Sequence, residues 1–178
     1  MNYVTENILP VRITDFAQGV ENSQTLLREK SVQIALDEPA VCRAYGGFIV
    51  LDFGREYSGG VRVLCHTVGG GNVKIRIRFG ESYTEANAEI GYKGMCNDHS
   101  PRDFYAEICD YSDLTFGQTG FRFVRLDFPS GVKTELKSVY AAYTHCGHMQ
   151  IGDFTCNDAL VNKVRRCLQT SMAACSAV

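Results

Sequence analysis

The amino-acid sequence predicts a mainly β protein: an antiparallel β-sandwich followed by one C-terminal amphipathic helix. Short segments with strand-like patterns recur through residues 31–145, with Gly-, Asn- or Pro-containing turns between them. No helical segments alternate with these strands, which argues against an α/β fold. From residue 157 onward the apolar residues take the helical spacing instead.

Composition places the chain among ordinary globular proteins. It has 178 residues, of which 45% are hydrophobic and 21% are charged. The net charge of -2 argues against a nucleic-acid partner, and no apolar run reaches the roughly 18 residues that a membrane span requires. The first 15 residues lack the basic start and apolar stretch of a signal peptide, so we expect a cytoplasmic location.

The eight cysteines contain no CxxC pair, and several stand in apolar runs such as residues 61–65. We therefore expect reduced, mostly buried thiols. His145, Cys146 and His148, with Cys156 nearby, do not have the spacing of a common zinc site. The glycine-rich pieces lack the Gly-Lys-Ser/Thr ending of a phosphate-binding loop. The sequence thus predicts neither a metal nor another cofactor.

Three regions are expected along the chain: a lead-in segment at 1–30, a β-sandwich domain at 31–154, and a helical segment at 155–178. The lead-in shows weak periodicity, with one short strand at 11–14. Alternation predicts a strand at 31–36, and the apolar run at 48–53 predicts a central strand.

The clearest pattern is a hairpin, with arms at 61–68 and 73–79 joined by three glycines and Asn72. In its second arm the apolar residues alternate with Lys74, Arg76 and Arg78. This predicts one core face and one wet, basic face. We interpret the basic stripe as a solvated sheet surface, with an acidic partner as the alternative.

Further elements follow from residue spacing. Glu81, Glu85 and Glu89, four apart, fit one side of a short helix, and residues 94–102 read as a loop. Strands are predicted at 104–109, 121–128 and 133–145, with a turn at 117–120. Asn157 is the expected cap of the final helix. The apolar stripe of that helix comprises Leu160, Val161, Val164, Leu168 and Met172.

The loop around residue 100 concentrates polar chemistry. An imidazole, two carboxylates, an amide and a guanidinium offer the donors and acceptors that sugar hydroxyls require. The same residues also stabilise turns, and Arg102 and Asp103 can pair with each other to hold the loop shut. The candidates for ligand or interdomain contact are Asn97, Asp98, His99, Arg102, Asp103 and Glu81.

Asp52, Glu56 and Glu81 are the candidate carboxylates for hydrolysis. Glycoside hydrolysis requires two carboxyl groups held roughly 5–10 Å apart across the bond. The sequence gives no such distance, and Asp52 at the end of an apolar run is also suited to stabilising a turn. No catalytic residue is therefore assigned.

The order of several motifs resembles the concanavalin-like, jelly-roll β-sandwich of bacterial α-L-rhamnosidases, glycoside hydrolase family 78. The resemblance covers about residues 45–170. The motifs that carry it are VLDFGRE at 50–56, GGVR at 59–62, IRFGES at 77–82, RD at 102–103, TGFRFVRL at 119–126 and FTCNDALVNKV at 154–164.

In that family the hydrolytic carboxylates belong to an (α/α)6 barrel, whose helices alone take well over 100 residues at about 11–12 residues each. Only 24 residues follow Phe154. The resemblance thus implies a non-catalytic sandwich with the first helix of the barrel, which supports that barrel and contributes to the rim of its substrate site. Rhamnose-containing glycans are the implied partners, and the apolar stripe of the final helix predicts self-association through residues 158–172.

The alternative is a free-standing carbohydrate-binding module, which would present aromatic rings to a sugar. The chain has no Trp, which leaves Tyr57, Tyr83, Tyr92 and Tyr105 as the platform. A complete small hydrolase and an interaction protein that uses the final helix are further hypotheses.

Overall fold

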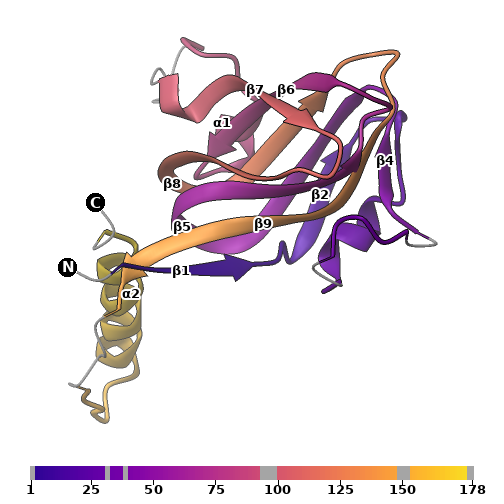
Figure 1. The fold of residues 1–178 in the computed structure, drawn as a ribbon. Coiled ribbons are helices and arrows are strands. Elements are labelled where there is room, and N and C mark those ends of the chain that lie inside the picture. The colour runs from indigo at the N-terminus through magenta and orange to yellow at the C-terminus, as the bar shows by residue number, and fades with distance from the viewer. Residues whose placement is uncertain (1–2, 31–32, 38–39, 93–99, 148–152, 176–178) are drawn as a thin grey trace.

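The fold is described by a computed structural model over residues 3–30, 33–37, 40–92, 100–147 and 153–175 (Figure 1). Nine strands pair in antiparallel fashion, and the predicted β-sandwich is confirmed. The strands are β1 (Tyr3–Ile8), β2 (Arg12–Phe16), β3 (Val20–Glu21), β4 (Cys42–Ala44), β5 (Gly47–Thr67), β6 (Asn72–Gly80), β7 (Asp103–Cys109), β8 (Asp113–Phe128) and β9 (Thr134–Cys146). The helices are α1 (Tyr83–Asn87) and α2 (Ala159–Cys175), with 3-10 turns η1 (Ser23–Leu27) and η2 (Ser100–Arg102).

Two long strands, β5 and β8, run through both layers of the sandwich. Residues 47–52 of β5 pair with β2 and with the second half of β8, which continues to β6 and β7. Residues 57–67 of β5 pair with the first half of β8 and with β9. The far edge of β9 carries β1 and β4 one after the other. We call these the first and second layers.

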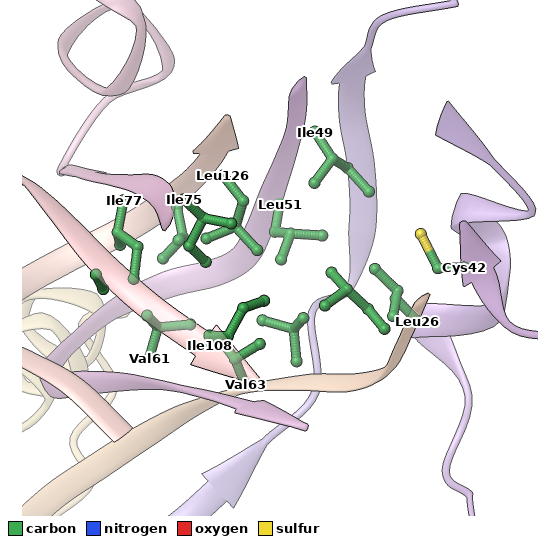
Figure 2. Close-up of a cluster of buried hydrophobic side chains, with 14 of the residues drawn as sticks. Leu26, Cys42, Ile49, Leu51, Val61, Val63, Ile75, Ile77, Ile108 and Leu126 are labelled. Carbon is green, nitrogen blue, oxygen red and sulfur yellow. The ribbon is translucent and has the colours of Figure 1, made fainter. Parts of the chain in front are cut away.

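The core lies between the layers and is built from the inward side chains of both (Figure 2). Leu51, Val61, Ile75 and Leu126 are fully buried there. Phe121 packs edge-on against Phe53, with ring centroids 5.8 Å apart. The core therefore depends on the period-two alternation that the sequence displays most clearly in β6.

Two predicted local features are wrong. Residues 33–36 form a turn, because the buried Lys137 ammonium donates to the Gln33 and Leu36 carbonyls and fixes the segment in place of a strand. Residues 117–120 are no turn either, since β8 runs through them unbroken. Gly117, at φ +77°, sits instead in an irregularity of the β5–β8 pairing. A glycine inside a strand marks such a bulge as readily as a turn.

The N-terminal 30 residues are more ordered than the single short strand that we expected there. They contain β1, β2 and β3 as well as η1, and β1 and β2 pair with β9 and β5. Among the described cysteines, Cys42, Cys65 and Cys146 are buried, as predicted, whereas Cys156 and Cys167 are exposed.

The final helix is confirmed and stands at the end of β9, beside the start of β1 (Figure 1). Its cap is Asp158, one residue later than expected, whose Oδ1 accepts from the Leu160 and Val161 amides. Leu160, Val161, Val164 and Leu168 are all exposed. No helix in the described part of the chain is long and apolar enough to cross a bilayer.

Candidate functional site

The outer face of the first layer carries a network of arginines and carboxylates, which we call the charged ridge: Arg76, Arg78, Arg125, Glu89, Asp103 and Asp127. Successive outward residues of β6 supply the first two arginines, and cross-strand neighbours on β7 and β8 supply the aspartates. Arg76 donates to Asp103 and to Glu89, each at 2.6 Å. Arg78 donates to Asp127 at 3.0 Å and to Glu89 at 3.1 Å.

The prediction of a wet, basic face is therefore wrong for Arg78, which is buried. The C-terminal end of α1 approaches this arginine, which also donates to the Asn87 carbonyl at 3.4 Å. Arg125 lies 3.8 Å from the centre of the Phe48 ring and donates to Asp127 at 2.7 Å. Three guanidiniums thus face three carboxylates, so the ridge presents little net charge.

Two members of the ridge, Arg76 and Glu89, favour each other's charged form. Hydrogen bonds from Arg76 lower the pKa of Glu89 despite some burial, and the bond to Asp103 raises the pKa of Arg76. Each carboxylate of the ridge already accepts from at least one guanidinium. A ligand that displaced one of these side chains would therefore leave its partner's charge without a counter-charge.

A second ion-pair group closes the segment that joins β6 to β7. Arg102, at the end of this segment, donates to Glu81 and to Glu85 at its start, each at 2.8 Å. The Ser82 hydroxyl caps α1 by accepting from the Glu85 amide. We call Arg102, Glu81 and Glu85 the clamp; it fixes both ends of the 81–102 segment.

The structure separates the predicted site residues. Glu81 and Arg102 meet in the clamp, but Asp103 pairs with Arg76 rather than with Arg102. Asn97, Asp98 and His99 lie outside the described residues. The helix fitted to Glu81, Glu85 and Glu89 is shorter than that spacing, because α1 spans only Tyr83–Asn87.

A hollow of about 380 Å³ opens beside α1, lined by Tyr83, Thr84, Asn87, Ala88, Glu89 and Tyr92. We call it the tyrosine hollow. Its two rings are 38% and 64% exposed, and an amide and a carboxylate stand between them in sequence. The exposed rings supply flat apolar faces that suit a sugar ring. The Asn87 side chain already accepts from Arg125 and donates to the Tyr83 carbonyl, and Glu89 accepts from Arg76 and Arg78, so the rings are the groups of the hollow that remain available.

Only part of this arrangement is predictable from the sequence. Tyr83 and Tyr92 were among the four proposed platform residues, whereas Asn87 was missed; the combination of two tyrosines nine residues apart around an Asn and a Glu was the available signal. Tyr57 is unsuited to the role because it is buried, edge-on against Tyr143. Tyr105 is exposed, with the Lys74 ammonium 5.2 Å from its ring centre.

The three carboxylates considered for hydrolysis lie in different surroundings, and Glu81 belongs to the clamp. Asp52 is fully buried and accepts from Arg12, Arg122 and the Gly54 amide, each at 2.8 Å. Glu56 is exposed, and its pKa is raised by partial desolvation and by the nearby Glu81. Within the described residues, no group of His, Cys, Asp and Glu has the arrangement of a metal site.

Comparison with known proteins identifies the fold. No family model matches the sequence, and no curated protein matches it. Among solved structures, the chain is similar to a rhamnosidase from Klebsiella oxytoca with rhamnose bound, at 14% identity and a TM-score of 0.68. That match covers 98% of this chain and 36% of the enzyme.

Two further solved structures match parts of the chain. A family 78 rhamnosidase of Bacillus sp. GL1 matches at 19% identity and a TM-score of 0.56, over 79% of this chain and 14% of the enzyme. A family 32 carbohydrate-binding module from Streptococcus pneumoniae EndoD matches at 10% identity and a TM-score of 0.49, over 78% of this chain and 99% of the module. At these identities the likeness concerns the fold, which is a β-sandwich also present within rhamnosidases.

Proposed function

We propose that this chain is the non-catalytic β-sandwich module of an α-L-rhamnosidase-like glycoside hydrolase of family 78. In this role the sandwich supports an (α/α)6 catalytic barrel through α2, and the 81–103 segment contributes to the rim of the substrate site. The chain spans about a third of the length of the Klebsiella rhamnosidase that it resembles in fold, so the catalytic work is assigned to a separate domain.

The apolar face of α2 is the observation that carries this proposal. Leu160 and Leu168 are more than half exposed, and Val161 and Val164 are nearly so. Full burial of such side chains is worth roughly 1.5–3 kcal/mol each, so their exposure leaves several kcal/mol unrealised. The match to the Klebsiella rhamnosidase covers 98% of this chain and therefore includes most of α2. The helix is thus part of the likeness in fold, together with the sandwich. Helices of a barrel in the same polypeptide are the proposed cover.

The test is to read the coding sequence beyond the codon for Val178 and to assay the whole product with an aryl α-L-rhamnoside. A helical barrel with rhamnosidase activity is expected. Val164→Glu should lower the thermal stability of that protein and its activity, whereas the matched surface change Lys163→Glu should not. Absence of any such barrel from the polypeptide would overturn the proposal.

A free-standing carbohydrate-binding module is the second candidate, and the tyrosine hollow favours it. Calorimetry with L-rhamnose and rhamnosyl oligosaccharides would then show binding to the 178-residue chain. Tyr92→Ala should abolish that binding because its ring is the more exposed of the two that line the hollow, and Tyr45→Ala, which removes an exposed ring elsewhere, should not. Binding that is unaffected by Tyr92→Ala would argue against this site.

A further inference from the structure

A second hollow, of about 380 Å³, crosses the outer face of the second layer. We call it the polar groove, and its floor and walls include Asn7, Gly60, Thr115, Gln118, Ala142 and Thr144. The strand register explains why residues so distant in sequence meet: Asn7 of β1 lies opposite Ala142 of β9, which lies opposite Gly60 of β5. The groove therefore runs across the strands.

The floor is low because backbone replaces side chains there. A Cβ atom on Gly60 would come within 2.4 Å of the Gly117 carbonyl oxygen and 2.5 Å of the Phe116 carbonyl oxygen, so this position accepts only glycine. Next to it, Ala142 is buried and rises little above the sheet. A volume of this size falls within the range of about 300–1,000 Å³ that small-ligand sites occupy.

A β-bulge shapes one wall. The β5–β8 register shifts between Gly59 and Val61, so that Gly60 faces both Gly117, at φ +77°, and Gln118. Bulges of this kind re-aim a side chain and are common beside binding sites. Here the bulge places the exposed Gln118 amide over the low floor.

Three polar side chains of the walls have no hydrogen-bond partner within the described chain: those of Asn7, Thr115 and Gln118. The Thr5 and Thr144 hydroxyls form one long hydrogen bond with each other, at 3.4 Å. The charged ridge on the other layer is the opposite case, because its ions satisfy one another. The groove thus keeps donors and acceptors available.

Charge selects among polar ligands. Arg62 is the one charged residue of the lining, and Asp113 takes its Nε and Nη2 donors, with the Nε bond at 2.7 Å. This pairing raises the pKa of Arg62 and cancels most of its field. Uncharged amides and hydroxyls then dominate, each able to donate and accept as sugar hydroxyls do.

We propose that the polar groove binds an uncharged oligosaccharide, at a site separate from the tyrosine hollow. A protein partner fits less well, because the lining lacks large apolar side chains and the apolar face of α2 offers such a partner its anchor. The choice of a rhamnose-containing probe rests on the proposed function; the site itself does not.

The experiment is an amide NMR titration of the 178-residue chain with the neutral disaccharide α-L-rhamnosyl-(1→6)-glucose. We expect shifts centred on the Gly60, Thr115 and Gly117 amides, and weaker binding of the acidic disaccharide galacturonosyl-(1→2)-rhamnose. Asn7→Ala and Gln118→Ala should each raise the Kd about 3- to 10-fold, as loss of one hydrogen-bonding side chain predicts. Gln24→Ala, an exposed Gln elsewhere, is the matched control and should leave the Kd unchanged.

Three results would overturn the inference. One is that the disaccharide causes no shifts of the groove amides, and another is that its shifts centre on Tyr83 and Tyr92 instead. The third is that the groove amides shift only when a catalytic domain, and not a sugar, is added to the chain. All three side chains that are changed are exposed, so unaltered thermal unfolding confirms that each variant folds. Failure of the proposed function would appear as the absence of a barrel from the polypeptide, and the titration would be unaffected by it.

Discussion

Asp52 is predicted to be a structural carboxylate, and its removal tests that role directly. Its side chain is 1% exposed and joins three strands: Arg12 comes from β2, Arg122 from β8, and Asp52 itself from β5. The Gly54 amide completes the set of donors at 2.8 Å. Asp52→Ala leaves all these donors without their acceptor, whereas Asp52→Asn keeps one oxygen and the shape.

The loss of unfolding free energy depends on whether each donor can hydrogen-bond to water once Asp52 is removed. Removal of one partner of a buried ion pair costs about 3–5 kcal/mol when the other charge stays buried. Here the Arg12 and Arg122 side chains are 60% and 37% exposed and regain water, so we expect about 2–3 kcal/mol for Asp52→Ala. At roughly 2–4 °C per kcal/mol for a chain of this size, the Tm should fall by about 4–12 °C. Asp52→Asn should cost about half as much.

Urea unfolding gives the free energies, and Asp113→Asn is the matched control. Asp113 belongs to a surface pair with Arg62, and its loss should cost below about 1 kcal/mol. A cost for Asp52→Ala no larger than that of the control would refute the reasoning. So would a loss of rhamnosidase activity in the whole polypeptide with no loss of stability, because it would indicate catalysis.

The pH dependence provides an independent check. Burial of Asp52 opposes its ionisation, but hydrogen bonds from Arg122, Gly54 and Arg12 outweigh it, and the folded pKa lies below 3.8. A depressed folded pKa contributes stability above the unfolded value and loses it as the pH falls. The stability difference between the unchanged chain and Asp52→Asn should therefore be constant well above pH 3.8 and shrink below it.

Three more predictions concern the remaining elements. Light scattering should show that the 178-residue chain self-associates, that Val164→Glu makes it monomeric, and that Lys163→Glu does not; a monomeric unchanged chain would contradict this. Arg102→Ala releases the clamp and leaves Glu85, whose side chain is 13% exposed, without its partner; limited proteolysis within 83–102 should accelerate, stability should fall by about 1–3 kcal/mol, and equal cleavage rates would argue against the clamp. Burial raises the pKa of Cys42 to about 12, so a disulfide reagent at pH 8 should modify the exposed Cys156 in the native state and Cys42 only after denaturation.

Elements with one buried face were the predictable part of the fold. The alternation of residues 73–79 gave β6, and the helical spacing after Asp158 gave α2. β1 escaped prediction because it is an edge strand exposed on both faces, so its sequence YVTENI carries no period-two signal. β5 is 21 residues long but contains Gly54, Gly59 and Gly60, which resemble strand ends in sequence and form bends within a continuous strand.

The candidate site was harder to predict because its partners are distant in sequence. Nothing local indicates that Arg78 meets Asp127, 49 residues away, or that Asp103 joins Arg76 rather than its neighbour Arg102. These pairs arise from strand register, which sequence alone does not fix. The polar groove was missed for the same reason: four strands contribute to it, and its uncharged side chains carry no chemical motif.

Recognition by this molecule is best sought among its uncharged groups. A charged residue on a sheet face attracts attention in a sequence, but here each carboxylate of the ridge already accepts from a guanidinium, and a ligand gains only what remains after that pair is broken. An unpartnered Asn or Gln offers its full hydrogen-bonding capacity and loses only water. By this reasoning the ridge and the clamp hold the first layer and its 81–102 segment in place, and we propose the polar groove for ligand binding, with the tyrosine hollow as the second candidate. Exchange of Asp127 for Asn should therefore change stability more than sugar affinity, and exchange of Gln118 for Ala the reverse.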